Sequence, residues 1–342
     1  MIMQQATYNG NRTIQLSKCQ PQAPGPDEVQ INVAYCGVCG TDLHIFLGHM
    51  DQRVDMPQVI GHEMSGVVAR VGTNVTQWQA GDRVVVRPLD PCNDCPACAA
   101  GHEHICQNLK FLGIDTPGAF QGSWTVPAHT LHQLPDTLSL DKAAMIEPIA
   151  VACHDVRLGE VQPGDKVVVI GGGPIGILNA LVAHNAGGDV LVSEVNPFRV
   201  NLAQELGLSA VNPKEIDLVA HVEEWTGGAG ADVVFEVSGT AIGAETMTKL
   251  ARTRGRVVVV AIFADAPKVD LFQFFWRELK MRGARVYEPE DFDQAIQLAA
   301  TGALPLDKLI TERYPLAQLQ TAFEQIASGA EVMKILINTQ SE

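Results

Sequence analysis

Four cysteines, which lie within fifteen residues, follow the pattern C-x2-C-x2-C-x7-C: Cys92, Cys95, Cys98 and Cys106. This spacing lets a short lobe, about residues 88–110, surround a tetrahedral metal ion with four thiolates. Because four protein ligands leave no position for a substrate, the pattern predicts a structural zinc site without chemistry of its own. Disulfide bonds are the alternative, and they require an oxidising compartment.

A second set of potential metal ligands lies nearer the N-terminus. Cys39 belongs to the segment C-G-V-C-G-T-D-L-H, and His62 and Glu63 are adjacent in G-H-E. A thiolate, an imidazole and a carboxylate are typical ligands of catalytic zinc, which keeps one position open for water or substrate. Each residue alone also occurs in protein cores without any metal. Their occurrence beside a dinucleotide motif favours a second zinc ion.

That motif is G-x-G-x-x-G, and it lies between an apolar segment, 166–170, and a predicted helix, 174–185. The first glycine permits a tight turn, the second lets the backbone approach a pyrophosphate, and the third lets helix and strand pack closely. A glycine-rich turn that serves packing alone is the alternative. We predict dinucleotide contacts from Gly171, Gly173, Pro174, Ile175 and Gly176.

Glu194 lies 23 residues after Gly171, at the end of a predicted strand, 189–194. A carboxylate there accepts hydrogen bonds from the adenosine ribose hydroxyls and repels the 2′-phosphate of NADP. We therefore expect NAD as the cofactor. Arg199, five residues further on, is a second predicted cofactor contact, and its guanidinium could in principle serve a phosphate.

Composition indicates a globular protein with two domains. The chain has 342 residues, of which 46% are hydrophobic, and a net charge of −15. No apolar run approaches the roughly twenty residues of a membrane span, and a negatively charged surface repels nucleic acid. Residues 1–10 show no features of an export signal. We therefore expect a cytoplasmic protein that binds neither membranes nor nucleic acid.

The order of predicted elements indicates an α/β protein. Short strands broken by glycine and proline dominate the first 150 residues, which is typical of an all-β domain. After Gly164, strands alternate with helices, and this alternation predicts a doubly wound parallel sheet. The pattern changes again near Pro289, where Asp291 could cap an amphipathic helix that contains Phe292 and Ala295.

Together, these motifs resemble the zinc-dependent medium-chain dehydrogenase/reductase superfamily over the whole chain, most of all its polyol, sugar-acid and threonine dehydrogenase branches. The matching segments are 39–44, 61–63, the four-cysteine lobe, Glu147-Pro148 and 171–176. The resemblance implies a GroES-like catalytic domain, 1–153 and 289–342, with a Rossmann-type NAD-binding domain, 154–288, inserted into it. It also implies an active site in the cleft between the two domains.

Several site residues follow from this resemblance by position. Cys39 and His62 correspond to ligands of the catalytic zinc. Glu147 stands where alcohol-specific members have a cysteine and polyol-specific members a glutamate. Glu63 corresponds to a carboxylate that either binds the zinc or approaches it during turnover. Which of the two carboxylates is the ligand at rest stays open.

Thr41 and His44 match the proton relay of the family. Hydride transfer from an alcohol also releases a proton, which needs a route to solvent. A hydroxyl that is bridged through the nicotinamide ribose to an imidazole near the surface supplies such a route. We therefore predict catalytic roles for Thr41 and His44 as well as Glu63; a loop histidine without a role is the alternative for His44.

We predict a zinc-dependent oxidoreductase that transfers a hydride reversibly from a secondary hydroxyl of a polyol or sugar acid to NAD. Each chain would hold two zinc ions, one catalytic and one structural. An L-threonine-type amino-alcohol dehydrogenase is the alternative, and a non-enzymatic zinc-ribbon binding protein represents another class. The resemblance also implies a homotetramer or dimer. Polar residues at 48–53 suit a small hydroxylated substrate, and Arg53 could pair with a carboxylate.

Overall fold

The computed structural model describes residues 3–341. Their contacts divide the chain into two compact units. Unit 1 comprises the residues up to Glu147, then Glu288–Gly302 and the residues from Leu306 onward. Unit 2 comprises Pro148–Tyr287 and Ala303–Pro305. Unit 1 is therefore discontinuous in sequence.

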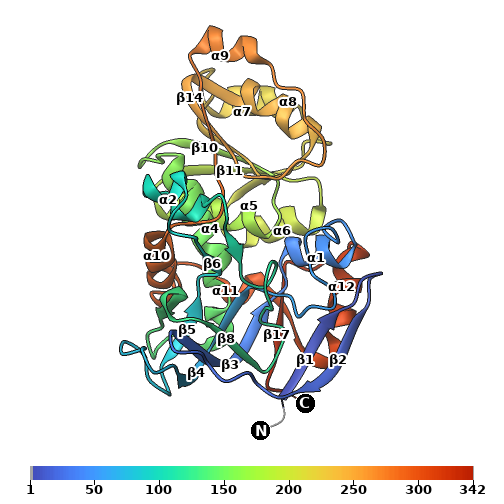
Figure 1. Ribbon diagram of the computed structural model, residues 1–342. Helices are drawn as coiled ribbons and strands as arrows, with labels where there is room; N and C mark the ends of the chain where they lie inside the picture. The colour runs from blue at the N-terminus through green and yellow to red at the C-terminus, as the bar shows by residue number, and fades with distance from the viewer. Residues whose placement is uncertain (1–2, 342) are drawn as a thin grey trace. The chain divides into compact units, whose positions relative to one another are not determined.

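A six-stranded parallel sheet forms the centre of unit 2, in the order β12-β11-β10-β13-β14-β15. Figure 1 labels β10, β11 and β14 of this sheet. Numbered along the unit, this is the order 3-2-1-4-5-6 of a doubly wound dinucleotide-binding sheet. The strands are β10 (Lys166–Ile170), β11 (Asp189–Ser193), β12 (Ser209–Val211), β13 (Ala231–Glu236), β14 (Ala251–Val259) and β15 (Lys280–Gly283). The helices are α5 (Pro174–Asn185), α6 (Pro197–Glu205), α7 (Leu218–Trp225), α8 (Ala241–Leu250) and α9 (Leu271–Arg277), and α4 (Ile146–Leu158) precedes β10.

The central strands of this sheet are buried on both faces. Val167, Val168 and Val169 of β10 are all fully buried, so successive side chains that point to opposite faces are both covered. Such continuous apolar strands are typical of parallel sheets that carry helices on both sides. Within residues 3–341, no helix is long and apolar enough to cross a bilayer.

Unit 1 is built on a seven-stranded sheet. Six strands follow the order β16-β17-β3-β4-β5-β9, and β8 also pairs with β3. The end of β3 (Glu28–Gly37) pairs with the C-terminal strand β17 (Lys334–Asn338), so the tail of the chain completes this sheet. The other strands are β4 (Glu63–Val71), β5 (Arg83–Val86), β8 (Ser123–Pro127), β9 (Leu131–Gln133) and β16 (Ile310–Pro315).

Two small sheets and several short helices complete unit 1. β1 (Met3–Tyr8) pairs with β2 (Ile14–Cys19), and β6 (Leu89–Asp90) pairs with β7 (Lys110–Phe111) at the base of the cysteine lobe. The lobe itself contains the first two of the short elements whose bounds follow. The remaining elements are α2 (Pro96–Ala99), η1 (Glu103–Ile105), η2 (Ala128–Thr130), α3 (Leu140–Ala143), α11 (Leu306–Leu309) and η3 (Leu316–Gln318).

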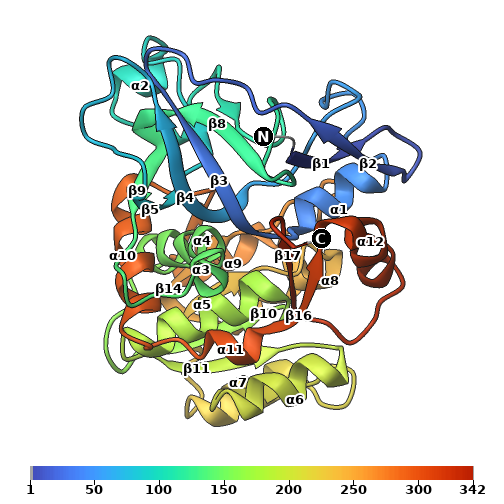
Figure 2. The same cartoon turned by 90° about the horizontal axis from the view of Figure 1, so that it is seen from below.

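Helices α1 (Gly40–Phe46) and α12 (Leu319–Ala327) lie side by side although they come from opposite ends of the chain (Figure 2). The buried rings of Phe46 and Phe323 stack between them, with centroids 4.9 Å apart. This contact fixes α1, the helix that Cys39 caps.

Helix α10 (Pro289–Ala300) begins near the predicted point, but its cap differs from the prediction. Glu288 is the N-cap residue, and Asp291 lies one turn inside the helix, where its carboxylate accepts the backbone N–H of Glu288 at 2.8 Å. The assignment of Asp291 as the cap is therefore wrong, because Pro289 already occupies the first helical position. Phe292 and Ala295 are buried, as the apolar spacing predicts.

Candidate active site

The structure brings the four sulfur atoms of the cysteine lobe together, all within 4.8 Å of one another. The Sγ atom of Cys95 lies 3.5 Å from that of Cys98 and 3.8 Å from that of Cys106, which lies 3.4 Å from that of Cys92. Thiolates about 2.3 Å from a tetrahedral zinc ion would be about 3.8 Å apart, so the lobe fits this metal. All eight cysteines, which lie within the described part of the chain, are free of disulfide bonds.

Backbone N–H groups stabilise negative charge on these sulfurs. Gln107 donates to Cys95 at 3.4 Å, and Asn108 donates to Cys106 at 3.3 Å. The backbone donors of Cys98 and Gln107 lower the pKa of Cys95 to about 6, whereas burial raises the pKa of Cys98 to about 12. The lobe therefore holds part of its negative charge in advance, and a bound cation would displace the remaining protons.

The second cluster joins ligands from two elements of unit 1. Cys39 is the N-cap residue of α1, and its Sγ accepts the N–H of Thr41 at 3.4 Å. His62 immediately precedes β4 and Glu63 begins it, with 2% and 1% of their surfaces exposed. One ligand atom from each of Cys39, His62 and Glu63 lies within 4.8 Å of the others. This donor set fits a zinc ion with an open position.

Asp42, which was not predicted, orients His62. Its buried Oδ1 lies 3.5 Å from His62 Nδ1, and its Oδ2 accepts the backbone N–H of Cys39 at 2.9 Å. Burial lowers the pKa of His62, but Asp42 and Cys39 together raise it well above its usual value. Because Nδ1 faces Asp42, Nε2 is left for a metal, as in other sites where a carboxylate supports a zinc-binding histidine.

Lys334, also not predicted, reaches the same cluster from β17. Its Nζ forms an ion pair with Glu63 Oε2, and the two side chains are 3% and 1% exposed. Burial lowers the pKa of Lys334, but the charges of Glu63, Cys39 and Glu147 raise it above its usual value. The cluster thus contains a buried cation in contact with one of its carboxylates.

Glu147 lies in the first turn of α4 and is 7% exposed. Its charge acts on Lys334, but its carboxylate is not among the atoms that lie within 4.8 Å of one another in the Cys39, His62 and Glu63 cluster. Glu63 is the carboxylate grouped with Cys39 and His62 in this structure. The role of Glu147 as a zinc ligand stays a prediction.

The predicted relay residues, Thr41 and His44, lie three positions apart on α1, a spacing that places them on one side of a helix. Thr41 is partly buried and His44 is exposed. His44 Nδ1 lies 3.1 Å from His49 Nδ1, so the two imidazoles can share a proton at the surface. The relay itself stays a prediction, because the ribose that would bridge Thr41 and His44 belongs to the cofactor.

In unit 2, the glycine motif turns the chain from β10 into α5. Gly171 has a φ of +100°, a conformation that favours glycine. Gly173 is the N-cap of α5, and Pro174 and Ile175 begin its first turn. A Cβ atom at Gly176 would overlap the carbonyl oxygen of Gly171. This close passage leaves the N-terminus of the helix facing the loop, a geometry that suits a pyrophosphate.

Glu194 follows β11, which ends one residue earlier than predicted, at Ser193. Its carboxylate accepts the N–H of Gly172 at 2.7 Å and the N–H of Asn196 at 2.8 Å. Each carboxylate oxygen keeps a lone pair that can accept a ribose hydroxyl. The guanidinium of Arg199 lies 3.9 Å from this carboxylate and is 34% exposed. The Glu194 carboxylate is thus held against the glycine loop, whereas the Arg199 guanidinium is partly exposed to solvent.

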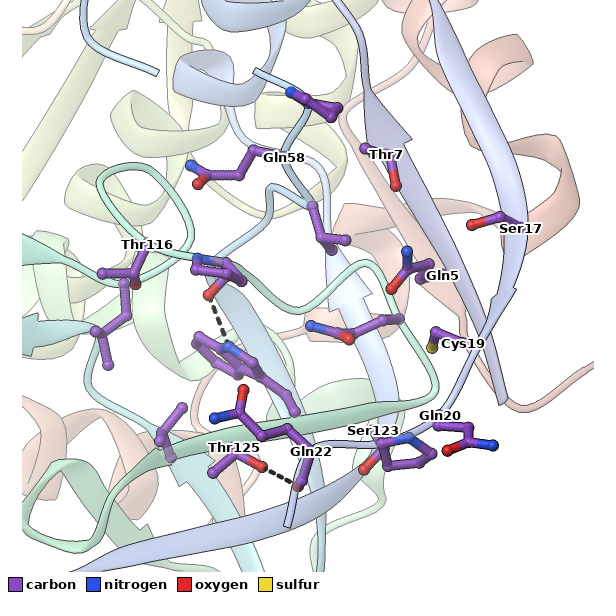
Figure 3. Close-up of a pocket in the computed structure, with 18 of the residues that line it drawn as sticks. Gln5, Thr7, Ser17, Cys19, Gln20, Gln22, Gln58, Thr116, Ser123 and Thr125 are labelled. Atoms are coloured by element: carbon purple, nitrogen blue, oxygen red, sulfur yellow. Dashed lines mark hydrogen bonds between the residues drawn. The ribbon is translucent and has the colours of Figure 1, made fainter. Parts of the chain in front are cut away.

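A cavity of about 750 Å³ opens in unit 1 (Figure 3). Its walls come from β1, β2, β8 and the segment 110–127, and half of the side chains that line it are uncharged amides or hydroxyls, such as Gln5, Gln58, Thr7 and Ser17. The predicted metal ligands are not among the lining residues. This cavity is therefore separate from the Cys39, His62 and Glu63 cluster.

Arg53, considered as a partner for a substrate carboxylate, already has one in the protein. Its Nε and Nη2 atoms donate to the two carboxylate oxygens of Asp115 at 2.7 and 2.9 Å. This bidentate pair occupies the Nε and Nη2 edge of the guanidinium. Arg53 is therefore a contact between two loops of unit 1 in this structure.

Two sequence signals could have identified the missed residues. Asp42 follows Cys39 by three positions, the spacing of a capping box at the start of a helix. Lys334 interrupts the apolar run of the last strand, and a lysine is rarely buried unless it is paired. Neither signal names the partner, because His62 and Glu63 are brought to these side chains only by the fold.

Comparison with known protein families gives two matches. Residues 25–136 match the model of an alcohol dehydrogenase GroES-like domain, and residues 174–301 match the model of a zinc-binding dehydrogenase. The first match lies in unit 1, and the second covers the α/β elements from α5 onward. The predicted fold class, a GroES-like domain combined with a Rossmann-type sheet, is confirmed.

Related proteins agree over nearly their full length. The chain is 53% identical to a 2-dehydro-3-deoxy-L-galactonate 5-dehydrogenase from Pseudoalteromonas atlantica, over 98% of this chain and 99% of the relative. It is 33% identical to an L-galactonate-5-dehydrogenase from Escherichia coli, over 92% of each chain. A zinc-binding dehydrogenase structure from Sinorhizobium meliloti, bound to NADP, superimposes with a TM-score of 0.93 at 30% identity over 99% of each chain. The chain is thus an enzyme, a dehydrogenase that belongs to the zinc-dependent medium-chain dehydrogenase/reductase superfamily.

Proposed function

We propose that this dehydrogenase oxidises a secondary hydroxyl of a sugar acid, with NAD as the hydride acceptor and 2-dehydro-3-deoxy-L-galactonate as its substrate. The observation that carries the reaction class is the convergence of Cys39, His62 and Glu63 within 4.8 Å. The 53% identity to an enzyme named for this compound supports the substrate, because the two chains align over almost their entire lengths.

Cys39 and His62 would hold the catalytic zinc, and the four-cysteine lobe would hold the structural one. The catalytic ion, when bound, acts as a Lewis acid that makes the substrate hydroxyl easier to deprotonate. Asp42 keeps His62 in the orientation that a metal needs. Thr41 and His44 carry the released proton toward solvent, since the hydroxyl and the imidazole can each pass on a proton.

Glu194 supports NAD as the preferred cofactor. Its carboxylate is held by two backbone N–H groups beside the glycine loop, where a 2′-phosphate would meet a fixed negative charge. Arg199 lies close enough to offset part of that charge, and a related structure carries NADP. The preference for NAD over NADP is therefore expected to be partial, and the ratio of kcat/KM with the two cofactors measures it.

A substrate panel tests the proposal. The purified enzyme is assayed with NAD and with NADP against 2-dehydro-3-deoxy-L-galactonate, L-galactonate, sorbitol, L-threonine and propan-2-ol, and the reduced cofactor is followed by its absorbance. We expect kcat/KM for the 2-dehydro-3-deoxy acid to exceed that for propan-2-ol by at least about 100-fold, because a pocket built for several hydroxyls penalises a compound that lacks them. L-Threonine as the best substrate would replace the proposal with the amino-alcohol alternative.

We also infer that the enzyme associates with a second copy of itself through unit 2. Helix α9 and strand β15 expose large apolar side chains: Leu271, Phe272, Phe275 and Trp276 are between 59% and 78% exposed, and Met281 is 49% exposed. Soluble monomers seldom show such a patch. Within residues 3–341, β15 is also the edge strand of the sheet, so one row of its backbone groups faces away from β14. A two-fold axis would supply the same edge and the same patch from the partner.

Light scattering after size-exclusion chromatography measures this association. Phe275→Lys with Trp276→Glu should lower the mass of the particle by at least half, because the pair places charges in the apolar patch. The matched control is Lys249→Glu, an exposed position on the neighbouring helix α8. An unchanged mass in the double variant would contradict association through this face.

A further inference from the structure

The Glu63 and Lys334 ion pair occupies a space that the backbone leaves for it. Gly37 on β3 lies opposite Glu63 on β4 and opposite Leu336 on β17. A Cβ atom at Gly37 would overlap the Glu63 carboxylate and would come within 2.9 Å of Lys334 Cε. The glycine therefore makes room between three strands for two buried charges.

The charges near the catalytic cluster explain why a cation is needed there. Four groups there carry negative charge, and the three carboxylates among them are at most 7% exposed: Cys39 as a thiolate, Asp42, Glu63 and Glu147. A bound divalent ion would balance only two of these charges. Buried charges without a partner are strongly destabilising, so the ammonium of Lys334 offsets a further one of these charges.

We propose that Lys334 is a positioning residue that holds the Glu63 carboxylate away from the catalytic zinc, so that the position needed by the substrate stays open. The inference rests on the proposed zinc site. Glu63 is close enough to Cys39 and His62 to serve as a further ligand, yet one of its oxygens is held by a buried lysine. With Cys39, His62 and the predicted ligand Glu147 on the ion, release of that oxygen would let Glu63 take the fourth position and close the site.

Lys334→Met tests this competition, since it removes the charge and keeps most of the apolar stem. We expect zinc release to a chelator to slow by roughly tenfold, because the freed Glu63 carboxylate becomes an added ligand, and kcat to fall by about 100-fold, because the substrate position is then occupied. Changes of about 10- to 100-fold are the size expected when the surroundings of a metal ligand are altered. The catalytic zinc is identified as the release phase that is absent from Cys39→Ser. Lys334→Arg should stay near wild type in both readouts, and Lys18→Met, on the exposed face of β2, is the surface control.

A double variant separates positioning from simple stabilisation. Lys334→Met combined with Glu63→Gln removes the carboxylate that would close the site, so zinc release should return toward the wild-type rate and kcat should recover by at least about tenfold. Zinc release that is as fast as or faster than wild type in Lys334→Met would overturn the proposal, and so would a double variant no better than the single one. Should Lys334→Met not fold, Lys334→Gln carries the same expectations. Zinc release is measured without substrate. Its result therefore tests the role of Lys334 even if the sugar-acid assignment is wrong.

Discussion

The two groups of metal ligands in unit 1 differ in how the chain assembles them. The cysteine lobe takes four identical ligands from fifteen consecutive residues, and its sulfurs accept hydrogen bonds from neighbouring backbone N–H groups. The Cys39, His62 and Glu63 cluster combines three kinds of ligand from the cap of α1 and the start of β4. It also depends on side chains with opposite charges or hydrogen-bonding roles, Asp42 beside His62 and Lys334 beside Glu63.

This difference is the one expected between a structural metal site and a catalytic metal site. A set of four thiolates is complete in itself, and its backbone donors do not change during a reaction. The second cluster has a ligand set that can change, because Glu63 is shared between the cluster and Lys334. Variants of the two groups should therefore fail in different ways, one in stability and the other in turnover.

The largest effect should come from the catalytic group. Cys39→Ser replaces a thiolate by a weak hydroxyl ligand, so we expect kcat/KM to fall by at least about 1,000-fold, since the Lewis acid is lost with the ion. The zinc content should drop from two to one per chain. The melting temperature should change by only a few degrees, because α1 remains held by α12 through Phe46 and Phe323. Full activity with two zinc ions retained would contradict the assignment of Cys39.

The next effect should appear in the lobe. Cys98→Ser removes one of four thiolates, and structural zinc contributes its binding energy to folding. We expect the loss of one zinc per chain and a melting temperature lower by roughly 5 to 10 °C, a loss of about 3 kcal/mol for a chain of this size. Activity measured well below the transition should stay within a few-fold of wild type. Cys19→Ser, which alters a cysteine outside both groups, is the matched control.

The same contrast explains what could be predicted from the sequence. Ligands close together in the chain, such as Cys92 to Cys106, can be predicted from spacing, and so can the turn at Gly171 to Gly176, because both depend on local geometry. The parallel sheet of unit 2 could be predicted from the alternation of strands and helices after Gly164, whereas its strand order comes from the structure. The discontinuous unit 1 was expected only through the family resemblance.

Long-range partners could not be obtained in this way. Lys334 meets Glu63 because β17 pairs with β3, which in turn pairs with β4. Nothing in the local sequence at either residue encodes that pairing. The cap of α10 shows the same limit on a smaller scale, since either Glu288 or Asp291 is a plausible cap and the position of Pro289 decides between them.

The smallest of the three effects should come from Asp42, which touches a ligand and not the metal. Asp42→Asn keeps an oxygen that can accept the N–H of Cys39 but removes the charge beside His62. Loss of such a support typically costs 10- to 100-fold in metal affinity or activity, so we expect kcat/KM to fall within about that range and zinc release from the catalytic group to accelerate. The release rate from the cysteine lobe should not change.

Asp293→Asn supplies a matched control for Asp42→Asn. Asp293 also lies beside a histidine in unit 1, with its Oδ1 3.1 Å from His132 Nδ1, but neither residue belongs to a metal group. Loss of a carboxylate beside a histidine therefore occurs in both variants, and only Asp42→Asn alters a predicted ligand. If the two variants lose activity to the same small extent and keep the same zinc release rates, Asp42 supports the fold of α1 and does not orient His62. If only Asp42→Asn releases zinc faster, the catalytic group depends on a residue outside its ligand set, as the comparison with the self-contained cysteine lobe requires.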